Sequence, residues 1–341
     1  MTKLKVGIIN VTAYAGVELA RLLSRHPKVS LTSVTGRSAA GQKLADVFPH
    51  LAGIDITISP ELGDVDFAFS AMPHKSSIEA VMPLVKRNIK VVDMSADCRL
   101  KDGNEYPKWY DFTHPAPHLL REAVYGLPEI HRKEIAKASL VAVPGCYPTG
   151  ALLALIPAVK EGIVHPDIIV DSKSGVSGAG RTLSLTTHYT EAVDNVCAYS
   201  VKGHRHLPEI VQELKALSDA PVSVTFLPHL VPMSRGILSS CYATLKQGVL
   251  GKKGEVLELY RHYYKGEPFV RVVDKPPETK QVWGSNVCLV YPIVDIRSNK
   301  LIVISCIDNL VKGAAGQALQ DMNIMLGFTE TEGLEALPIY P

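Results

Sequence analysis

The stretch VGIINVTAYAGVELARLL, residues 6–23, decides the fold. It begins as a short run typical of a buried strand, passes through a turn at residues 10–16, and continues with leucines at helical spacing. The helix should end before His26 and Pro27, because a residue that precedes proline disfavours the helical backbone region. A strand, a tight turn and a helix in this order place the first N–H groups of the helix, and its dipole, where they can bind an anion such as a phosphate.

The turn of this stretch carries a single glycine, Gly16, so its glycine pattern is weak. Asn10 tolerates a left-handed backbone, whereas Ala13 places a methyl group where a closely bound phosphate would need space. A strand–turn–helix without a ligand is therefore the alternative interpretation of this segment. The candidate cofactor contacts on the turn are Thr12, Ala13, Tyr14, Ala15 and Gly16.

Strand-like and helical runs alternate through the first half of the chain. Further strand candidates are Val29–Thr35, Val65–Ser70, Lys90–Asp93 and Leu140–Val143. Each is followed by Gly, Pro or Ser, and strands that alternate with helices pair in parallel through right-handed crossovers. We therefore expect the α/β class, with a Rossmann-type doubly wound parallel sheet over residues 1–147 together with 313–341.

After residue 147 the strand-like runs become more frequent and more amphipathic. The strand candidates are Ile168–Asp171, Val222–Leu227, Leu238–Leu245, Phe269–Val273, Val287–Val294 and Leu301–Asp308. Helical runs are expected at Pro208–Leu217, at Glu255–Tyr264 and, with small residues on one face, at Lys312–Leu326. The pattern predicts an α+β domain on a largely antiparallel or mixed sheet over residues 148–312.

The composition excludes several classes of protein. Thirty-six Lys and Arg against 34 Asp and Glu give a net charge of +2, so no excess of positive charge indicates a nucleic-acid or anionic-membrane surface. No apolar run approaches the ~18 residues of a membrane span, and the N-terminus lacks the features of a signal peptide. Six cysteines without CxxC spacing predict a reduced, cytoplasmic protein and argue against structural zinc.

The end of the second strand indicates which nicotinamide cofactor would bind. An NAD-binding domain carries an acidic residue about 20 residues after the glycine turn, where it binds the ribose hydroxyls. This chain has Arg37 and Ser38 at that place, and a guanidinium and a hydroxyl suit a 2′-phosphate. NADP is therefore favoured over NAD. Another strand closes at residues 72–76 on the same edge, where Pro73 is a further candidate cofactor contact.

Cys146 has the surroundings of a nucleophile. It lies in VPGCYPTG, residues 143–150, directly after a strand and before an apolar helix at Ala151–Val159. A helix N-terminus favours the thiolate over the thiol, and the flanking Pro and Gly indicate an exposed turn. The cysteines at 241, 288 and 306 lie inside strand-like runs and are expected to be buried, while those at 98 and 197 are left open.

Two histidines in GHRHLPE, residues 203–209, could supply the proton transfer that a thiol nucleophile needs. His204 and His206 stand just before a predicted helix. They could instead bind a metal, but the nearby sequence offers no third ligand, so we predict no metal site.

Two loops offer donors to an anion. SKSGVSGAGR, residues 172–181, combines glycine, serine and cations, and DMSADCR, residues 93–99, places donors at the end of a strand. A mobile surface loop is the alternative for the first of them. The candidate substrate contacts are Ser95, Arg99, Ser174, Gly175 and Arg181, and further candidate cofactor contacts are Ser177, Gly178 and Asn309.

Together these segments resemble one family, the N-acetyl-γ-glutamyl-phosphate reductases, within the wider aspartate-semialdehyde-dehydrogenase-like group. The matching segments run from residue 5 to about residue 327. They are AMPHKSS (71–77), DMSADCRL (93–100), AVYGLPEI (123–130), PGCYPTG (144–150), SKSGVSGAGR (172–181), GHRHLPEI (203–210), PHLVPMSRGIL (228–238) and DNLVKGAAGQALQ (308–320).

The resemblance implies an NADPH-dependent reduction of a small acyl phosphate to an aldehyde, in arginine biosynthesis. Cys146 matches the nucleophile of the family, and His206 is favoured over His204 as its acid/base. The resemblance also implies a homodimer or homotetramer formed through the second domain, and a C-terminal helix that returns to the nucleotide domain.

The chain differs from the family at a few positions. Asn10 and Ala13 stand where the phosphate loop usually has glycine, and Lys75 stands where glycine is common. Three alternatives stay open: a sibling reductase that acts on carrier-bound aminoadipyl phosphate, a nucleotide-binding protein without catalysis, and a thiol hydrolase.

Overall fold

The structure, a computed structural model, describes residues 3–248 and 254–341. The chain folds into two compact units. The first comprises the chain up to Pro144 together with Ala314–Ala336, and the second comprises Gly145–Gly313 together with Leu337–Pro341. Among the described residues, no helix is long and apolar enough to cross a membrane.

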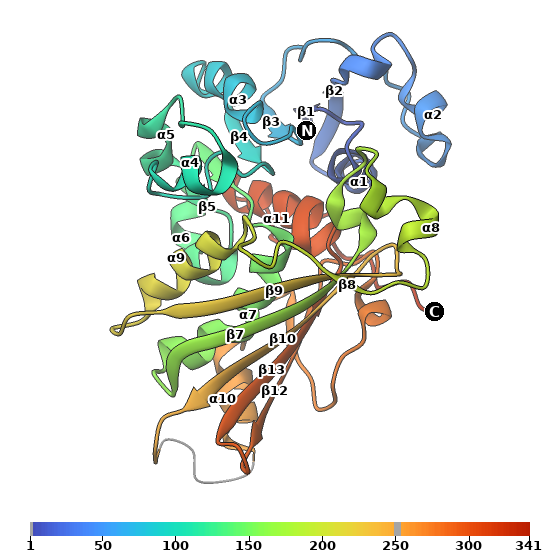
Figure 1. The fold of residues 1–341 in the computed structure, drawn as a ribbon. Helices are drawn as coiled ribbons and strands as arrows, with labels where there is room; N and C mark the ends of the chain where they lie inside the picture. The colour runs from blue at the N-terminus through green and yellow to red at the C-terminus, as the bar shows by residue number, and fades with distance from the viewer. Residues whose placement is uncertain (1–2, 249–253) are drawn as a thin grey trace. The chain divides into compact units, whose positions relative to one another are not determined.

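The first unit contains a six-stranded sheet in which every strand runs parallel to its neighbours, in the order β2-β1-β3-β4-β6-β5 (Figure 1). Its strands are β1 (Leu4–Ile9), β2 (Val29–Val34), β3 (Phe67–Ser70), β4 (Lys90–Asp93), β5 (Val124–Tyr125) and β6 (Leu140–Ala142). The chain runs from β1 to β2 on one side and then crosses to β3 on the other side of β1, and such a reversal of strand order is where sheets of this kind bind ligands. The predicted doubly wound parallel sheet is confirmed.

The helices of the first unit connect and cover these strands. The longer ones are α1 (Tyr14–Leu23), α3 (Ser77–Lys86), α6 (Pro128–Ile135) and α11 (Gly316–Met325), and the shorter ones are α2 (Leu44–Val47), α4 (Glu105–Tyr110) and α5 (Pro117–Glu122). Helix α1 ends at Leu23, before His26 and Pro27, as predicted. The sequence analysis named no helix at α2, α3, α4, α5 or α6, and of these α2, α4, α5 and α6 are short helices that show little periodicity.

The second unit contains a seven-stranded mixed sheet in the order β11-β12-β13-β10-β7-β9-β8. Its strands are β7 (Val164–Gly175), β8 (Cys197–Ala198), β9 (Ser223–Val231), β10 (Ile237–Leu245), β11 (Val270–Val272), β12 (Cys288–Asp295) and β13 (Lys300–Ile307). Strand β7 runs parallel to β9 and β11 runs parallel to β12, while the other pairs are antiparallel. This confirms the predicted α+β domain on a mixed sheet.

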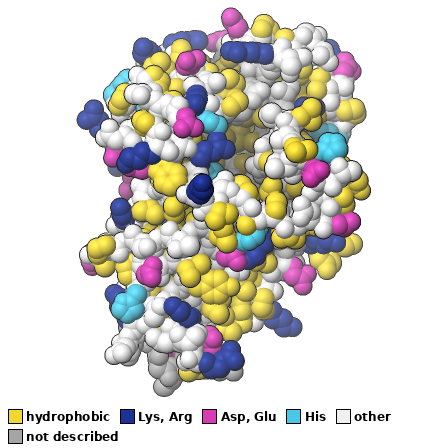
Figure 2. Space-filling model, in the orientation of Figure 1, with side chains coloured by type: hydrophobic (Ala, Val, Ile, Leu, Met, Phe, Trp, Pro, Cys, Tyr) yellow, Lys and Arg dark blue, Asp and Glu magenta, His cyan; other side chains and the backbone are white. Residues whose placement is uncertain are grey.

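One face of this sheet packs against helices and the other is open. Helix α7 (Cys146–Lys160) contacts β10 and β13, α9 (Leu207–Leu217) contacts β9, and α10 (Glu255–Tyr263) contacts β12. Along β7, Ile168 is buried and the next residue, Ile169, is 49% exposed, because successive side chains point to opposite faces. Figure 2 shows hydrophobic side chains gathered over these strands.

The C-terminal part of the chain departs in two details from the sequence prediction. A single helix was expected over Lys312–Leu326, but a π-helical turn at Val311–Ala315 precedes α11. The sequence also grouped all of residues 313–341 with the first domain, whereas Leu337–Pro341 packs with the second unit. The reason is local: the backbone N–H of Ile339 donates to the carbonyl of Trp283 at 2.8 Å.

Strand β4 ends at a fully buried carboxylate, Asp93. It accepts hydrogen bonds from the hydroxyl of Ser77 at 2.7 Å, and from the backbone N–H and the hydroxyl of Ser95 at 2.9 and 2.7 Å. Burial raises the pKa of Asp93 to about 6, although the hydrogen bonds from Ser95 act in the opposite direction. The native state therefore keeps this proton to a higher pH than the unfolded chain does.

This pKa predicts how the stability of the protein depends on pH. Between about pH 4 and 6 the native state binds more protons at Asp93 than the unfolded state, so the contribution of Asp93 to stability falls as the pH rises. We expect Asp93→Asn to be destabilising at pH 4, because it disturbs the bonds to Ser77 and Ser95. The difference in free energy of unfolding between wild type and Asp93→Asn should shrink by about 3 kcal/mol between pH 4 and pH 7.

Thermal unfolding of the wild type and of Asp93→Asn between pH 4 and pH 7 measures this difference in stability. Val92→Ala, a substitution at the neighbouring buried position of β4, is the matched control, since it removes packing without removing a titratable group. A deficit of Asp93→Asn that stays constant or grows with pH would contradict the prediction.

Candidate active site

The turn between β1 and α1 is shaped by Asn10 and Gly16. Asn10 has a φ of 63°, the left-handed conformation that its sequence allowed, and its side-chain amide donates to the carbonyl of Ala71 at 2.9 Å. Gly16 lies so close to this turn that an added Cβ would be 2.6 Å from the carbonyl oxygen of Asn10. The N-cap of the helix is Ala13, whose side chain makes no capping hydrogen bond. A helix start without a side-chain cap is one at which an anion can be bound.

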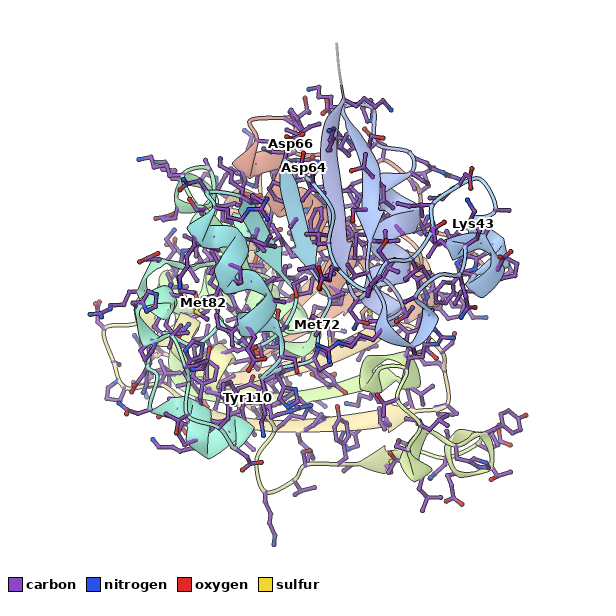
Figure 3. All side chains as sticks on the ribbon, turned by 90° about the horizontal axis from the view of Figure 1, so that it is seen from above. Lys43, Asp64, Asp66, Met72, Met82 and Tyr110 are labelled. Carbon is purple, nitrogen blue, oxygen red and sulfur yellow. The ribbon has the colours of Figure 1, made fainter. Side chains whose placement is uncertain are left out.

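A cavity of about 760 Å³ opens at the carboxyl ends of β1, β2 and β3 in the first unit. Four of the predicted cofactor contacts line it: Thr12, Arg37, Ser38 and Pro73. The cavity lining does not include the other predicted residues of the turn, Ala13, Tyr14, Ala15 and Gly16. Figure 3 labels Met72, a lining residue just after β3, and Asp66 near the opposite end of that strand.

Several residues that line this cavity were not among the cofactor contacts predicted from the sequence. They include Asn10, Thr35 and Gly36 at the ends of β1 and β2, and Glu61, Leu62 and Ser76 in the connections around β3. The only sequence signal for the first group was their place at a strand end. The second group comes from irregular segments that carry no periodicity.

Ser95 and Arg99, both predicted to contact substrate, are buried and bonded within the first unit. The hydroxyl of Ser95 donates its only hydrogen to Asp93. Nε of Arg99 donates to the carbonyl of Val143 at 2.7 Å, and Nη2 donates to the carbonyl of Met94 at 2.9 Å. These contacts hold together the carboxyl ends of β4 and β6.

Cys146 is the first residue of α7 and is half-buried. Its helix has Gly145 as N-cap, with no side-chain capping bond, so the helix dipole acts on the thiol from the first turn. Of the other cysteines, those at 98, 241, 288 and 306 are buried, and Cys197 is half-buried. The expectation of buried cysteines at 241, 288 and 306 is confirmed.

The two histidines lie beside the Cys146 turn but differ in environment. An added Cβ on Gly145 would be 2.6 Å from Nε2 of His206, so this imidazole packs directly on the residue before Cys146. His204 is buried among aromatic rings, including those of Tyr147 and Tyr199, and its Nδ1 accepts the backbone N–H of His206 at 3.0 Å.

Burial lowers the pKa of His204 to about 4, and the neighbouring Arg205 acts in the same direction. The ring is therefore neutral at neutral pH, with Nδ1 as acceptor. A neutral, buried imidazole holds the backbone in place but cannot supply a proton as an imidazolium.

The predicted anion loop follows β7 and is built on a close backbone approach. Gly175 has no room for a side chain, since an added Cβ would be 2.8 Å from the carbonyl oxygen of Met233. Ser174 is buried, whereas Arg181 is exposed. Ser177 accepts a hydrogen bond from the side-chain amide of Asn309 at 3.0 Å.

Asn309 also stabilises a second turn, the one at Gly236, because its side-chain oxygen accepts the backbone N–H of Gly236 at 2.8 Å. The structure thus brings Ser174, Gly175, Ser177, Gly178 and Asn309 together in the second unit, where Gly178 lies close to the hydroxyl of Ser174. Across residues 3–248 and 254–341, no three His, Cys, Asp or Glu side chains are arranged to hold a metal ion.

Two family models match the chain. Residues 5–138 match the NAD binding domain of semialdehyde dehydrogenases, and residues 146–309 match the semialdehyde dehydrogenase dimerisation domain. The chain is 59% identical to the N-acetyl-gamma-glutamyl-phosphate reductase of Dehalococcoides mccartyi strain CBDB1, over 100% of both chains. It is 48% identical to the N-acetyl-gamma-glutamyl-phosphate reductase of Desulforamulus reducens, over 99% of this chain and 100% of that one.

Solved structures show the same fold at low identity. Aspartate semialdehyde dehydrogenase II from Vibrio cholerae superimposes with a TM-score of 0.70 at 16% identity, covering 96% of this chain and 99% of that one. Aspartate semialdehyde dehydrogenase with NADP from Candida albicans gives a TM-score of 0.69 at 15% identity, covering 95% of this chain and 99% of that one.

Proposed function

We propose a function from the family to which this chain belongs, the N-acetyl-gamma-glutamyl-phosphate reductases. The chain reduces N-acetyl-γ-glutamyl phosphate to N-acetylglutamate 5-semialdehyde and phosphate, in arginine biosynthesis. The observation that carries the proposal is the placement of Cys146 at the first turn of α7, directly after the glycine on which His206 packs. A reactive thiolate beside an imidazole is the arrangement that acyl transfer to sulfur requires.

Cys146 acts as the nucleophile. Its thiolate forms a bond to the acyl carbon, the carbon–oxygen bond to the phosphate breaks, and phosphate leaves with that electron pair. The product is a thioester, which accepts a hydride more readily than a carboxylate because sulfur donates little resonance to the carbonyl. After the thioester has been reduced, the carbon–sulfur bond breaks with its electron pair returning to sulfur, which releases the aldehyde and the Cys146 thiolate. The reduction is thus divided into two easier steps.

His206 acts as the acid/base. Its ring lies against Gly145, and it holds the proton that moves to and from the substrate oxygen next to Cys146. His204, which the sequence left as the second candidate, is neutral and holds the backbone N–H of His206 instead. Ser174, Gly175 and Arg181 are the proposed contacts for the acyl phosphate, while Ser95 and Arg99 support the neighbouring strand ends.

The cofactor is a nicotinamide dinucleotide, and we propose NADP. A bound NADPH supplies the hydride for the reduction. The residues of the first unit fit this group, since its cavity has exposed Arg37 and Ser38 at the end of β2 and an uncapped helix start at Ala13. The other proposed contacts are Thr12, Tyr14, Ala15, Gly16, Pro73, Ser177, Gly178 and Asn309.

The protein acts as a homo-oligomer, formed through the open face of the second sheet. This face exposes Ile169 and Ile293, and the match to a dimerisation domain covers the strands that carry them. We propose a homodimer, or a homotetramer assembled from such dimers. A cytoplasmic location agrees with six cysteines of which none is paired in a disulfide.

Replacement of the nucleophile tests the reaction. Cys146→Ala should reduce kcat by roughly 1,000-fold or more, because no other group forms the thioester. NADPH affinity should stay within about twofold, since the predicted cofactor cavity lies in the first unit. NADPH oxidation in the presence of N-acetyl-γ-glutamyl phosphate, followed by absorbance, measures the change.

Cys197→Ser is the control, because Cys197 is the other half-buried cysteine and lies outside the proposed machinery. Substantial turnover by Cys146→Ala would refute the mechanism. Wild-type activity on the aminoadipyl analogue alone would assign the chain to the sibling reductases, and hydrolysis of the acyl phosphate without NADPH would make it a thiol hydrolase.

Arg37 tests the choice of cofactor. Arg37→Ala should raise the KM for NADPH by about 10- to 100-fold, the effect of a lost charge-assisted hydrogen bond to the 2′-phosphate, and leave the KM for NADH nearly unchanged. Arg87→Ala removes another exposed arginine of the first unit, outside the cavity, and should change neither constant. An equal loss for both cofactors in Arg37→Ala would show that Arg37 does not recognise the 2′-phosphate.

A further inference from the structure

Glu209 is a buried carboxylate in the first turn of α9, three residues after His206. A glutamate at this third position of a helix commonly folds back and accepts the backbone N–H of the N-cap residue. The N-cap of α9 is His206. Its backbone N–H donates to Nδ1 of His204 at 3.0 Å instead.

The carboxylate of Glu209 reaches a different segment of the chain. Its Oε2 accepts the backbone N–H of Gly145 at 2.9 Å, a contact between residues 64 positions apart. Gly145 is the N-cap of α7 and immediately precedes Cys146. Its carbonyl in turn accepts the N–H and the hydroxyl of Thr149, at 3.0 and 3.1 Å. The peptide groups on both sides of Gly145 are therefore held in place.

The imidazole of His206 packs on the same glycine, Gly145. An added Cβ on Gly145 would lie between 2.6 and 2.8 Å from three ring atoms, so the ring rests on the glycine without space between them. Any shift of this turn would therefore change the position of Cys146 relative to His206. The first turn of α9 thus supplies both the imidazole of His206 and the carboxylate of Glu209, which binds the turn at Gly145.

We propose that Glu209 is a positioning residue, whose carboxylate holds the Gly145–Cys146 turn against the imidazole of His206. The neutral His204 contributes by accepting the N–H of His206 that a glutamate at this position of a helix would otherwise bind. The buried Oε2 has its acceptor role met here by the backbone N–H of Gly145, and it lies in the first turn of α9, where a helix N-terminus favours an oxygen acceptor. The inference rests on the proposed role of Cys146 as nucleophile.

Two variants of Glu209 distinguish the effect of its hydrogen bond to Gly145 from the effect of its side-chain volume. Glu209→Ala removes the acceptor of the Gly145 N–H, and we expect kcat to fall by about 100-fold, the effect of a displacement of about 1 Å between reacting groups. The KM for NADPH should stay within about twofold, because the predicted cofactor cavity is in the first unit. Glu209→Gln keeps an amide oxygen that can accept the same N–H, and should restore kcat to within about fivefold of wild type.

Glu213→Ala is the matched control. Glu213 lies one turn further along α9, is 5% exposed, and accepts a hydrogen bond from Gln212 at 2.8 Å. It should lower the thermal unfolding midpoint without lowering kcat. If Glu209→Ala does not fold, the comparison of Glu209→Gln and Glu209→Asp with wild type decides, since Asp is too short to reach Gly145 from the same backbone position.

A second readout does not depend on the overall reaction. The rate of iodoacetamide labelling at Cys146, measured by mass spectrometry of its peptide, should fall in Glu209→Ala and recover in Glu209→Gln. Wild-type kcat and labelling in Glu209→Ala would overturn the proposal, as would a Glu209→Gln variant that is as impaired as Glu209→Ala. A wild-type chain that labels at Cys146 but reduces no acyl phosphate would refute the proposed function and leave the role of Glu209 to be decided by labelling alone.

Discussion

The first unit depends on one constraint, which is that the inner strands of its parallel sheet, β1, β3, β4 and β6, are buried over most or all of their length. All four residues of β3 are buried, and a buried strand has no position at which a charged side chain can reach solvent. Polar groups therefore collect where the strands end. Asn10 follows β1, Thr35 follows β2 and Asp93 ends β4, and the cavity lies along this edge. The location of this cavity, where we propose that the cofactor binds, follows from how the sheet is packed.

In the second unit the corresponding constraint is the burial of one helix, α7. Residues Tyr147–Val159 of α7 are buried, so the first turn is where this helix can meet a substrate, and Cys146 stands there half-buried. A thiol in the middle of the helix would be enclosed in the core and have its pKa raised, as burial raises the pKa of Cys241 to about 12. The apolar character of α7 thus determines where its proposed nucleophile can be.

Local patterns in the sequence predicted the parts of the fold that local physics controls. The turn at Asn10 and the end of α1 at Leu23 follow from backbone preferences of single residues, and the alternating strands follow from periodicity. Contacts between distant segments have no such signal. The bond from Gly145 to Glu209 joins two helices, and the lining of the cavity by Glu61 depends on the path of an irregular segment.

Chemical identity was easier to predict than protonation. The sequence offered His204 and His206 as proton-transfer partners of Cys146, but it could not show how deeply either ring is buried. In the structure aromatic rings enclose His204, and burial lowers its pKa to about 4. In the same way, the hydroxyl of Ser95 looked available in the sequence, and a buried Asp93 accepts its hydrogen.

At two positions where the resemblance to the family implies glycine, this chain has other residues in a backbone conformation typical of glycine. Asn10 and Lys75 have φ values of 63° and 72°, a region in which a side chain costs about 1–2 kcal/mol. Each is compensated by hydrogen bonds: Asn10 donates to Ala71, and the backbone N–H of Lys75 donates to Asp97 at 2.8 Å. Because the backbone path that glycine would permit is retained, the loss of glycine at these positions does not by itself indicate a protein that has lost catalysis.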